Sequence, residues 1–320
     1  MTRRRFFLAG LGASMVAPGA ALAWPDRPLR IIVGFQAGGG SDVIARLAAE
    51  RLRVPLGGAS IVVENKPGAA GSLAADLVLG AHDGHTLLVL SDSLLTASLT
   101  NRRVHFQPLR DFKPVSLLAE GTIVVVANEH APFRDFASLV AYVRANPGKL
   151  NYVTAGLGGQ QHLTAEYMAA ALKLDMTHVP MRGGSQATQD LLSGQVDAGV
   201  LGVGPTLPHI RSGRLVPLAV SVATRLPQLP EVPTLGEVGL PGFAVGQWFG
   251  LAVPADAPDE VVTRLANAVG QALDDDTTRR HYDDVGFTAH PSSPAEFVDK
   301  IRTEETRWRK LIAERGLKLD

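Results

Sequence analysis

The 320-residue sequence contains no cysteine, so the folded chain has no disulfide. A chain of this length can bury enough apolar surface to be stable without one, and its length favours two lobes. Aromatic residues make up only 6% of the sequence, and 31 basic residues balance 31 acidic ones. Proteins that bind nucleic acid or anionic membranes usually carry an excess of basic residues, so the charge balance argues against both partners.

The sequence also lacks the familiar catalytic and nucleotide-binding motifs. The glycine-rich segment GFQAGGGSD (34–42) has neither the lysine of a P-loop nor the glycine spacing of a dinucleotide-binding turn. There is no G-x-S-x-G elbow, no H-E-x-x-H motif and no cysteine nucleophile. His82 and His85 have a metal-like spacing, but the Asp-Gly between them predicts a tight turn. We therefore expect no catalytic residues, metal or cofactor.

The N-terminus has the pattern of an export signal. Arg3, Arg4 and Arg5 precede an apolar stretch that ends in Ala21-Leu22-Ala23, a typical cleavage sequence. The arginines also suit a twin-arginine signal, and the sequence leaves that route and the general one open. Cleavage near Ala23 would leave 28 of the 31 basic residues against 31 acidic ones, a net charge of −3. We expect a periplasmic protein, and no later apolar run approaches the length of a membrane span.

Apolar runs typical of buried strands alternate with amphipathic helical patterns along the rest of the chain. This alternation predicts an α/β fold with mostly parallel sheets covered on both faces. Pro227–Pro241 is expected to be a loop, and the chain after Asp256 to be largely helical. The expected strands are Leu29–Phe35, Ser60–Val63, Thr86–Leu90, Thr122–Ala127, Leu150–Thr154 and Leu215–Val222, and the clearest helices are Val43–Leu52 and Leu163–Leu172.

Four strand ends run into short segments rich in glycine, serine and amides. These segments are 34–42, 91–93, 155–162 and 182–186, the last following an apolar run at His178–Met181. Each offers small residues and a potential capping side chain before a helix, such as Ser41 or Asp42 before Val43. Free N–H groups and the helix dipole make such junctions good anion sites. One such junction is ordinary in α/β proteins, but four together favour a ligand.

Six ordered segments carry a family resemblance. They are WPDRPLRIIVGFQAGGGSDVIAR, IVVENKPGAAGS, AHDGHTLL, NPGKLNYVTAGLGGQQHLTAE, HVPMRGGSQATQDLLSGQVD and LPEVPTLGEVGLPG with the later WFGLAVPADAP. From residue 24 to the end, the chain resembles the Bug, or TctC-like, receptors of tripartite tricarboxylate transporters. The resemblance implies a type II periplasmic-binding fold, in which crossing strands join two α/β lobes around a ligand cleft. It also implies binding of a small organic carboxylate and its delivery to a large and a small membrane permease subunit.

The resemblance places lobe 1 at residues 24–127 and 244–320 and lobe 2 at 128–243, with crossings near Ala127–His130 and Ala244–Gln247. Residues 1–23 form the signal peptide, and a monomer is expected. Met181 and His85 stand where the family commonly has tyrosine, and GGQQ replaces a serine-rich loop, which leaves the identity of the carboxylate open. The expected ligand-binding residues are Phe35, Ala37, Gly38, Gly39, Ser41, Asp42, Ser91, Asp92, Thr154, Ala155, Gly158, Gln160, Gln161, His162, Met181, Arg182 and Gly183.

Arg182 is the only cationic side chain in the four segments, so neutral dipoles would hold most of the charge of a carboxylate. A solvated arginine at a lobe edge is an equal alternative for this residue. Two other functions stay open at this stage. The chain could present a ligand to a membrane sensor, or it could be an exported enzyme acting on a carboxylate, although no nucleophile and base are arranged for that reaction.

Overall fold

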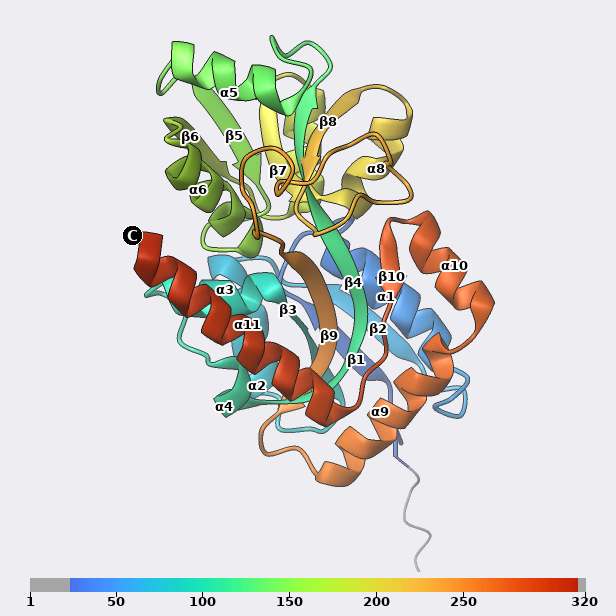
Figure 1. Cartoon of the computed structure of the whole chain (residues 1–320). Helices are drawn as coiled ribbons and strands as arrows, with labels where there is room; N and C mark the ends of the chain where they lie inside the picture. Colours follow the sequence, from blue (N-terminus) through green and yellow to red (C-terminus); the bar gives the residue numbers. More distant parts are fainter. Residues whose placement is uncertain (1–23, 316–320) are drawn as a thin grey trace, which may run out of the picture.

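A computed structural model describes residues 24–315 of the chain. The predicted signal peptide, residues 1–23, lies outside the described residues. Within residues 24–315, no helix is both long and apolar enough to cross a bilayer. The α/β architecture expected from the alternating pattern is confirmed, with two lobes joined by crossing strands (Figure 1).

The strands and helices alternate along most of the described chain. The strands are β1 (Leu29–Val33), β2 (Ile61–Asn65), β3 (Thr86–Ser91), β4 (Phe112–Asn128), β5 (Leu150–Thr154), β6 (Met176–Pro180), β7 (Ala198–Gly202), β8 (Leu215–Val220), β9 (Gly246–Pro254) and β10 (Phe287–Ala289). The helices are α1 (Gly40–Leu52), η1 (Ala69–Gly71), α2 (Ser72–Leu79), α3 (Asp92–Thr100), α4 (Pro108–Asp111), α5 (Phe136–Ala145), α6 (Gln160–Leu172), α7 (Gly184–Leu192), α8 (Val203–Arg211), α9 (Asp259–Leu273), α10 (Asp276–Asp284) and α11 (Pro294–Arg315).

One continuous sheet runs through both lobes in the order β2-β1-β3-β9-β4-β7-β5-β6, and β8 and β10 also pair with β4. In lobe 1, β1, β2 and β3 are parallel, and β9 runs antiparallel to β3. In lobe 2, β5 is parallel to both β6 and β7. The parallel strands of each lobe therefore point their carboxyl ends in one direction, and the helices that follow them begin at that edge.

The long strand β4 joins the two lobes. Its residues Phe112 to Thr122 pair with β9, whereas Ile123 to Asn128 pair with β7 and β8. The change of partner thus occurs between Thr122 and Ile123, earlier than the crossing expected at Ala127–His130. At the second connection between the lobes, Val245 bonds to Ser221 of lobe 2 while Gly246 pairs with Thr122. Figure 1 shows β4 continuing from lobe 1 into lobe 2, with β9 beside its lobe 1 half.

Each half of the sheet is buried on both faces. Alternate residues of β1 enter different cores: Ile31 and Val33 pack on one face, and Ile32 packs on the other. Residues of β4 divide in the same way within lobe 2. This explains the continuous apolar runs of the central strands. The expected buried strand at Ser60–Val63 is corrected, because β2 lies at the sheet edge and is only half-buried.

The last helix, α11, lies along both lobes. Phe297 and Ile301 pack into a lobe 1 core, and Trp308 is fully buried in a lobe 2 core. In Figure 1, α11 passes beside α3 and ends near α6. The start of α11 therefore packs on lobe 1, whereas its last turns, expected with the rest of 244–320 in lobe 1, pack on lobe 2.

Removing the Trp308 side chain should destabilise both lobes together. Trp308→Ala leaves a cavity in the lobe 2 core and frees the end of a helix that is anchored in lobe 1. We expect a loss of about 3–5 kcal/mol in the free energy of unfolding, measured by urea denaturation. Arg309→Ala is the control. This exposed arginine pairs with Glu305 alone among the described residues, and its removal should change the free energy of unfolding by less than about 1 kcal/mol. Equal stability of the two variants would contradict this role of Trp308.

Candidate functional site

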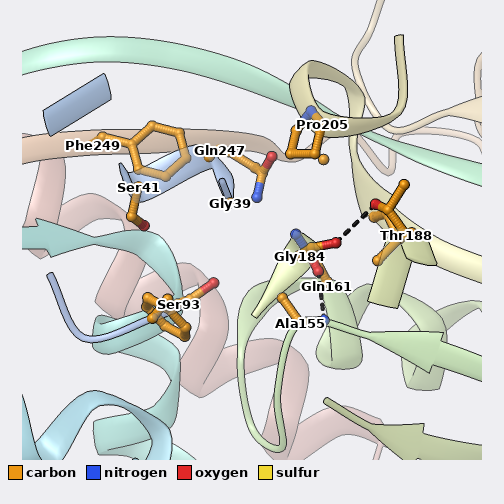
Figure 2. A pocket seen from close by; sticks show the side chains of 14 residues that line it. Gly39, Ser41, Ser93, Ala155, Gln161, Gly184, Thr188, Pro205, Gln247 and Phe249 are labelled. Atoms are coloured by element: carbon orange, nitrogen blue, oxygen red, sulfur yellow. Dashed lines mark hydrogen bonds between the residues drawn. The ribbon is translucent and has the colours of Figure 1, made fainter. Parts of the chain in front are cut away.

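A cavity lies between the two lobes at the carboxyl ends of their strands. Its lining, drawn in Figure 2, is Phe35, Gly39, Gly40, Ser41, Ser93, Ala155, Gln161, Gly184, Thr188, Leu201, Gly202, Pro205, Gln247 and Phe249. About 30 Å³ of it is open to the centre of a water molecule, which is room for a small polar group and little more. None of the described residues in this lining is charged.

Five helices begin at this cavity. They are α1, α3, α6, α7 and α8, represented in the lining by Ser41, Ser93, Gln161, Gly184 and Gly202. Four of these helices have glycine at the N-cap and no side-chain cap; the exception is α3, where the Ser91 hydroxyl accepts from Leu94 N. Uncapped helix N-termini leave backbone N–H groups available and contribute positive potential. The cavity can therefore hold an anion without any charged side chain.

The helix start at the triple glycine differs from the expectation. Ser41 or Asp42 was expected to cap a helix beginning at Val43, but α1 begins at Gly40 and its N-cap is Gly39. Gly38 has the positive φ of this turn, +79°, whereas φ of Gly39 is −80°. Gly39 lies close to the other lobe: a Cβ there would be in van der Waals contact with Gly184 N at 3.5 Å, which leaves little room for a larger side chain.

The structure brings together some of the expected ligand-binding residues. Phe35, Gly39, Ser41, Ala155 and Gln161 line the cavity. Gln161 is held in place because its Oε1 accepts from Ala155 N at 2.9 Å, as the dashed line in Figure 2 shows. Met181 and Arg182 line a neighbouring space, together with Phe35 and Ala155.

Two of the expected residues join the lobes directly. Ser185 donates from its hydroxyl to Ala37 O at 2.7 Å, and Gln36 N donates to Arg182 O at 3.2 Å. Gly183 lies against Gln36, since a Cβ on it would meet Gln36 N at 3.0 Å. The segment that contains Ala37 thus contacts the segment that contains Gly183, and the cleft is closed over the cavity.

The other expected residues do not line the cavity. They support its walls instead. Gly38 N donates to Asp42, and Ser91 caps α3. Gln160 donates to Gly246 O and so ties α6 to the crossing strand. Asp92 accepts from Ser93 N, and Gly158 N donates to His162. Thr154 bonds to Gly156 O and to His178 of β6.

Comparison with known proteins agrees with this architecture. Residues 44–317 match the family described as Tripartite tricarboxylate transporter family receptor. The chain belongs to this family of receptors. BugT of Bordetella pertussis is 32% identical over 310 residues, which are 96% of this chain and 95% of BugT.

Two solved structures are similar over almost their whole length. Rpa4515 of Rhodopseudomonas palustris, solved with adipate, is 31% identical with a TM-score of 0.88, and the match covers 92% of this chain and 99% of that one. MatC from the same organism, with bound malate, is 33% identical with a TM-score of 0.85, covering 90% and 100%. The expected Bug-type receptor and its type II periplasmic-binding fold are thereby confirmed.

A histidine pair holds the 155–162 segment of the receptor. The rings of His162 and His178 stack with centroids 3.7 Å apart, and His162 Nδ1 accepts from Gly158 N. Burial, followed by the neighbouring His162, lowers the pKa of His178 to about 3, so that ring is neutral. The nitrogen of His162 that faces away from Gly158 lies 3.5 Å from Glu166 Oε1. His162 therefore helps to hold the 155–162 segment in place.

The histidines of the HDGH segment bind separate partners. His82 Nδ1 lies 2.7 Å from Asp256 Oδ2, and His85 Nδ1 bonds to Asp83 O. The expected tight turn is confirmed, since Asp83 accepts from His85 N and Thr86 N and Gly84 has φ of +62°. Among residues 24–315, no group of three potential ligands could hold a metal ion.

Two aspartates next to the cavity, Asp42 and Asp92, are held so that they repel an anion little. Burial raises the pKa of Asp42, but hydrogen bonds from Arg46 and Gly38 outweigh it and leave the pKa below its ordinary value. Arg46 Nη2 lies 2.9 Å from Asp42 Oδ1 and neutralises the charge of this carboxylate. Burial raises the pKa of Asp92 well above its ordinary value, with a further contribution from Glu304. Its Oδ1 accepts from Ser93 N, the neighbour that lines the cavity.

Sequence reasoning missed the second wall of the receptor's cavity. Gly40, Ser93 and Gly184 lie within the segments expected at the site, although they were not among the expected binding residues. Six lining residues lie outside those segments: Thr188, Leu201, Gly202, Pro205, Gln247 and Phe249. The segment AGVLGVGP (198–205) has the same strand, glycine and helix pattern as the four recognised junctions, so it could have been found. Gln247 and Phe249 had no such signal, because they reach the cavity only through the pairing of β9.

The raised pKa of Asp92 predicts a pH dependence of stability. The native state holds this proton more tightly than the unfolded chain, so the free energy of unfolding falls as pH rises above the ordinary value of 3.8. Asp92→Asn removes this titration, and its free energy of unfolding should fall less between about pH 4 and pH 7 than that of the wild type. Asp76→Asn, at an exposed position of α2, is the control. Parallel pH curves for wild type and Asp92→Asn, from denaturant titrations, would contradict the prediction.

Proposed function

We propose that the chain is a periplasmic receptor that captures a small organic carboxylate between its lobes and delivers it to a membrane permease of two subunits. The observation that carries the proposal is the meeting of five helix N-termini at a cavity with uncharged lining. The similar structures that contain adipate and malate support a carboxylate as the ligand class. We further propose that the receptor is a monomer and releases its ligand unaltered.

The proposed site combines the expected and the newly found residues. The N–H groups of the α1, α6, α7 and α8 N-termini and the hydroxyls of Ser41 and Ser93 would surround one carboxylate. Thr188 is less available, since its hydroxyl donates to Gly184 O at 2.8 Å (Figure 2). Phe249 and Leu201 would exclude water from the other side. Ala37, Arg182 and Gly183 would act by holding the lobes together around the ligand.

Binding requires that the two backbones approach each other at Gly39. Gly39→Val places a branched side chain where Gly184 N of the other lobe already lies 3.5 Å from an ideal Cβ. The lobes should then close incompletely, and carboxylate affinity should fall more than about tenfold, which corresponds to roughly 1.4 kcal/mol. Isothermal calorimetry with the best ligand from a carboxylate screen measures the loss, and X-ray scattering measures the compaction on binding.

The control for this variant is Gly270→Val, in α9, where an added Cβ meets nothing within 4 Å. Its affinity should match that of the wild type. If folded Gly39→Val binds as tightly as Gly270→Val, the glycine serves only the turn. If no small carboxylate stabilises the wild type against heat, the proposed ligand class is wrong.

Export is proposed from the first 23 residues. Cleavage near Ala23 would start the mature receptor at Trp24, whose ring Nε1 donates to Gly84 O at 3.1 Å, close to the start of β3. N-terminal sequencing of the protein from the cell envelope should therefore begin at or near Trp24. An intact N-terminus on folded, freely soluble protein would contradict export by cleavage.

A further inference from the structure

One phenylalanine ring near the cavity is surrounded by three glycines. Phe287, the first residue of β10, is buried and packs edge to face on Phe249, with the ring centroids 5.5 Å apart. A Cβ added at Gly121 would lie 2.8 Å from Phe287 Cδ1, one at Gly40 would lie 3.2 Å from Cζ, and one at Gly204 would lie 2.5 Å from Cζ. The ring therefore occupies the space in which side chains at these positions would have to lie.

The three glycines belong to three different elements around the site. Gly121 lies directly opposite Phe287 in the pairing of β4 with β10, next to the point where β4 changes partners. Gly40 is the first residue of α1 in lobe 1, and Gly204 is in the first turn of α8 in lobe 2. Both helices begin at the cavity, where Gly40 and Gly202 are part of the lining. One ring thus lies against the starts of two helices from opposite lobes.

The backbone beside this ring also meets lobe 2. Gly286 has a φ of +81°, and a Cβ on it would lie 3.0 Å from Gly204 Cα. A Cβ on Gly204 would in turn lie 2.9 Å from Val285 O. Main-chain atoms cannot move aside without moving the element to which they belong, and packed elements have little free space. The 285–287 segment therefore limits how closely α8 approaches lobe 1.

Phe287 is anchored in lobe 1 and is not part of the cavity lining. It belongs to the same core as Phe249 and Tyr282, and β10 pairs with residues 119–121 of β4. On another side it borders a separate space of about 680 Å³, which Val203 also lines. A ring pushed by an extra atom on α8 could turn into this space, or it could hold its place and push α8 away. Its contacts with Phe249 and β4 favour the second outcome.

We propose that Phe287 is a positioning residue that sets the spacing between the N-termini of α1 and α8 in the closed receptor without touching the ligand. Helix N-termini bind an anion together only when their N–H groups converge on one place. A displacement of α8 relative to α1 would disrupt that convergence. The glycine at 204 is the counterpart of the ring, because a side chain there would hold the lobes apart. The proposal concerns lobe closure and does not depend on which anion is bound.

Closure can be measured without a ligand because the chain has no cysteine of its own. A Cβ on Gly38 would lie 3.5 Å from Ser185 Cβ of the other lobe, within the range of about 3.5–4.5 Å found in disulfides. The parent protein for the test therefore carries Gly38→Cys and Ser185→Cys. Its rate of cross-linking by oxidised glutathione, followed on non-reducing gels, reports the closed population. Any strain from the substitution at Gly38 is common to all variants compared.

Gly204→Ala in this parent should slow cross-linking about fivefold or more, because the added methyl group meets the tip of the Phe287 ring and Val285 O. Phe287→Leu removes the ring atoms that the methyl group meets. The double variant should therefore cross-link at least about threefold faster than Gly204→Ala alone. Urea denaturation of each variant gives its stability, and a purely structural role of Phe287 predicts that adding Phe287→Leu lowers stability further and restores nothing.

Gly270→Ala is the control, since a Cβ at this position of α9 meets nothing within 4 Å, and it should cross-link at the rate of the parent. The proposal is overturned if Gly204→Ala cross-links as fast as Gly270→Ala, because the ring has then moved aside. It is also overturned if Phe287→Leu does not restore the rate. If Gly204→Ala does not fold, Phe287→Leu must restore both folding and cross-linking, and an unfolded double variant counts against the proposal. None of these results bears on the proposed carboxylate, since no ligand is present.

Discussion

The pairing of β4 with β9 is the constraint on which the site depends. β4 pairs antiparallel with β9 in lobe 1, changes partners between Thr122 and Ile123, and so carries the sheet into lobe 2. Because both lobes attach to this pair, the carboxyl ends of their parallel strands face the same space. Five helices then begin around one cavity, although residues 41 and 202 belong to different lobes and lie far apart in the sequence. Without this pairing, each lobe would have isolated helix ends and no enclosed site.

The electrostatics of the receptor follow from this arrangement. Uncapped N-termini provide positive potential without a mobile charged side chain, and the nearby carboxylates are prevented from cancelling it. Asp42 is paired with Arg46, and the environment of Asp92 favours its neutral form by raising its pKa. Dipoles of this kind bind an anion less tightly than a buried pair of salt bridges would, which suits a protein that must release its ligand again.

Much of the fold could be predicted because the central strands are buried on both faces. Their continuous apolar runs gave the bounds of β5 correctly and those of β1, β3 and β8 within a few residues. Most of the first half of β4 was missed, since Ser116, Glu120 and Gly121 interrupt its apolar pattern. Their environment comes from segments distant in sequence: Ser116 bonds with Ser292 in the loop before α11, and Glu120 bonds with Lys300 of α11.

The site was predicted where local sequence determines it and missed where tertiary pairing does. Gly39, Ser41 and Gln161 follow directly from a strand, a turn and a helix in sequence. The helix starts were placed too late, at Val43 and Leu163, because a glycine N-cap gives no side-chain signal. Yet the missing cap is itself the functional feature. A serine or aspartate cap at Gly39 would occupy the N–H groups proposed to bind the ligand, and its Cβ would already contact Gly184 N of the opposite lobe at 3.5 Å. Glycine at this position therefore leaves the donors free and lets the second lobe come close enough to share them.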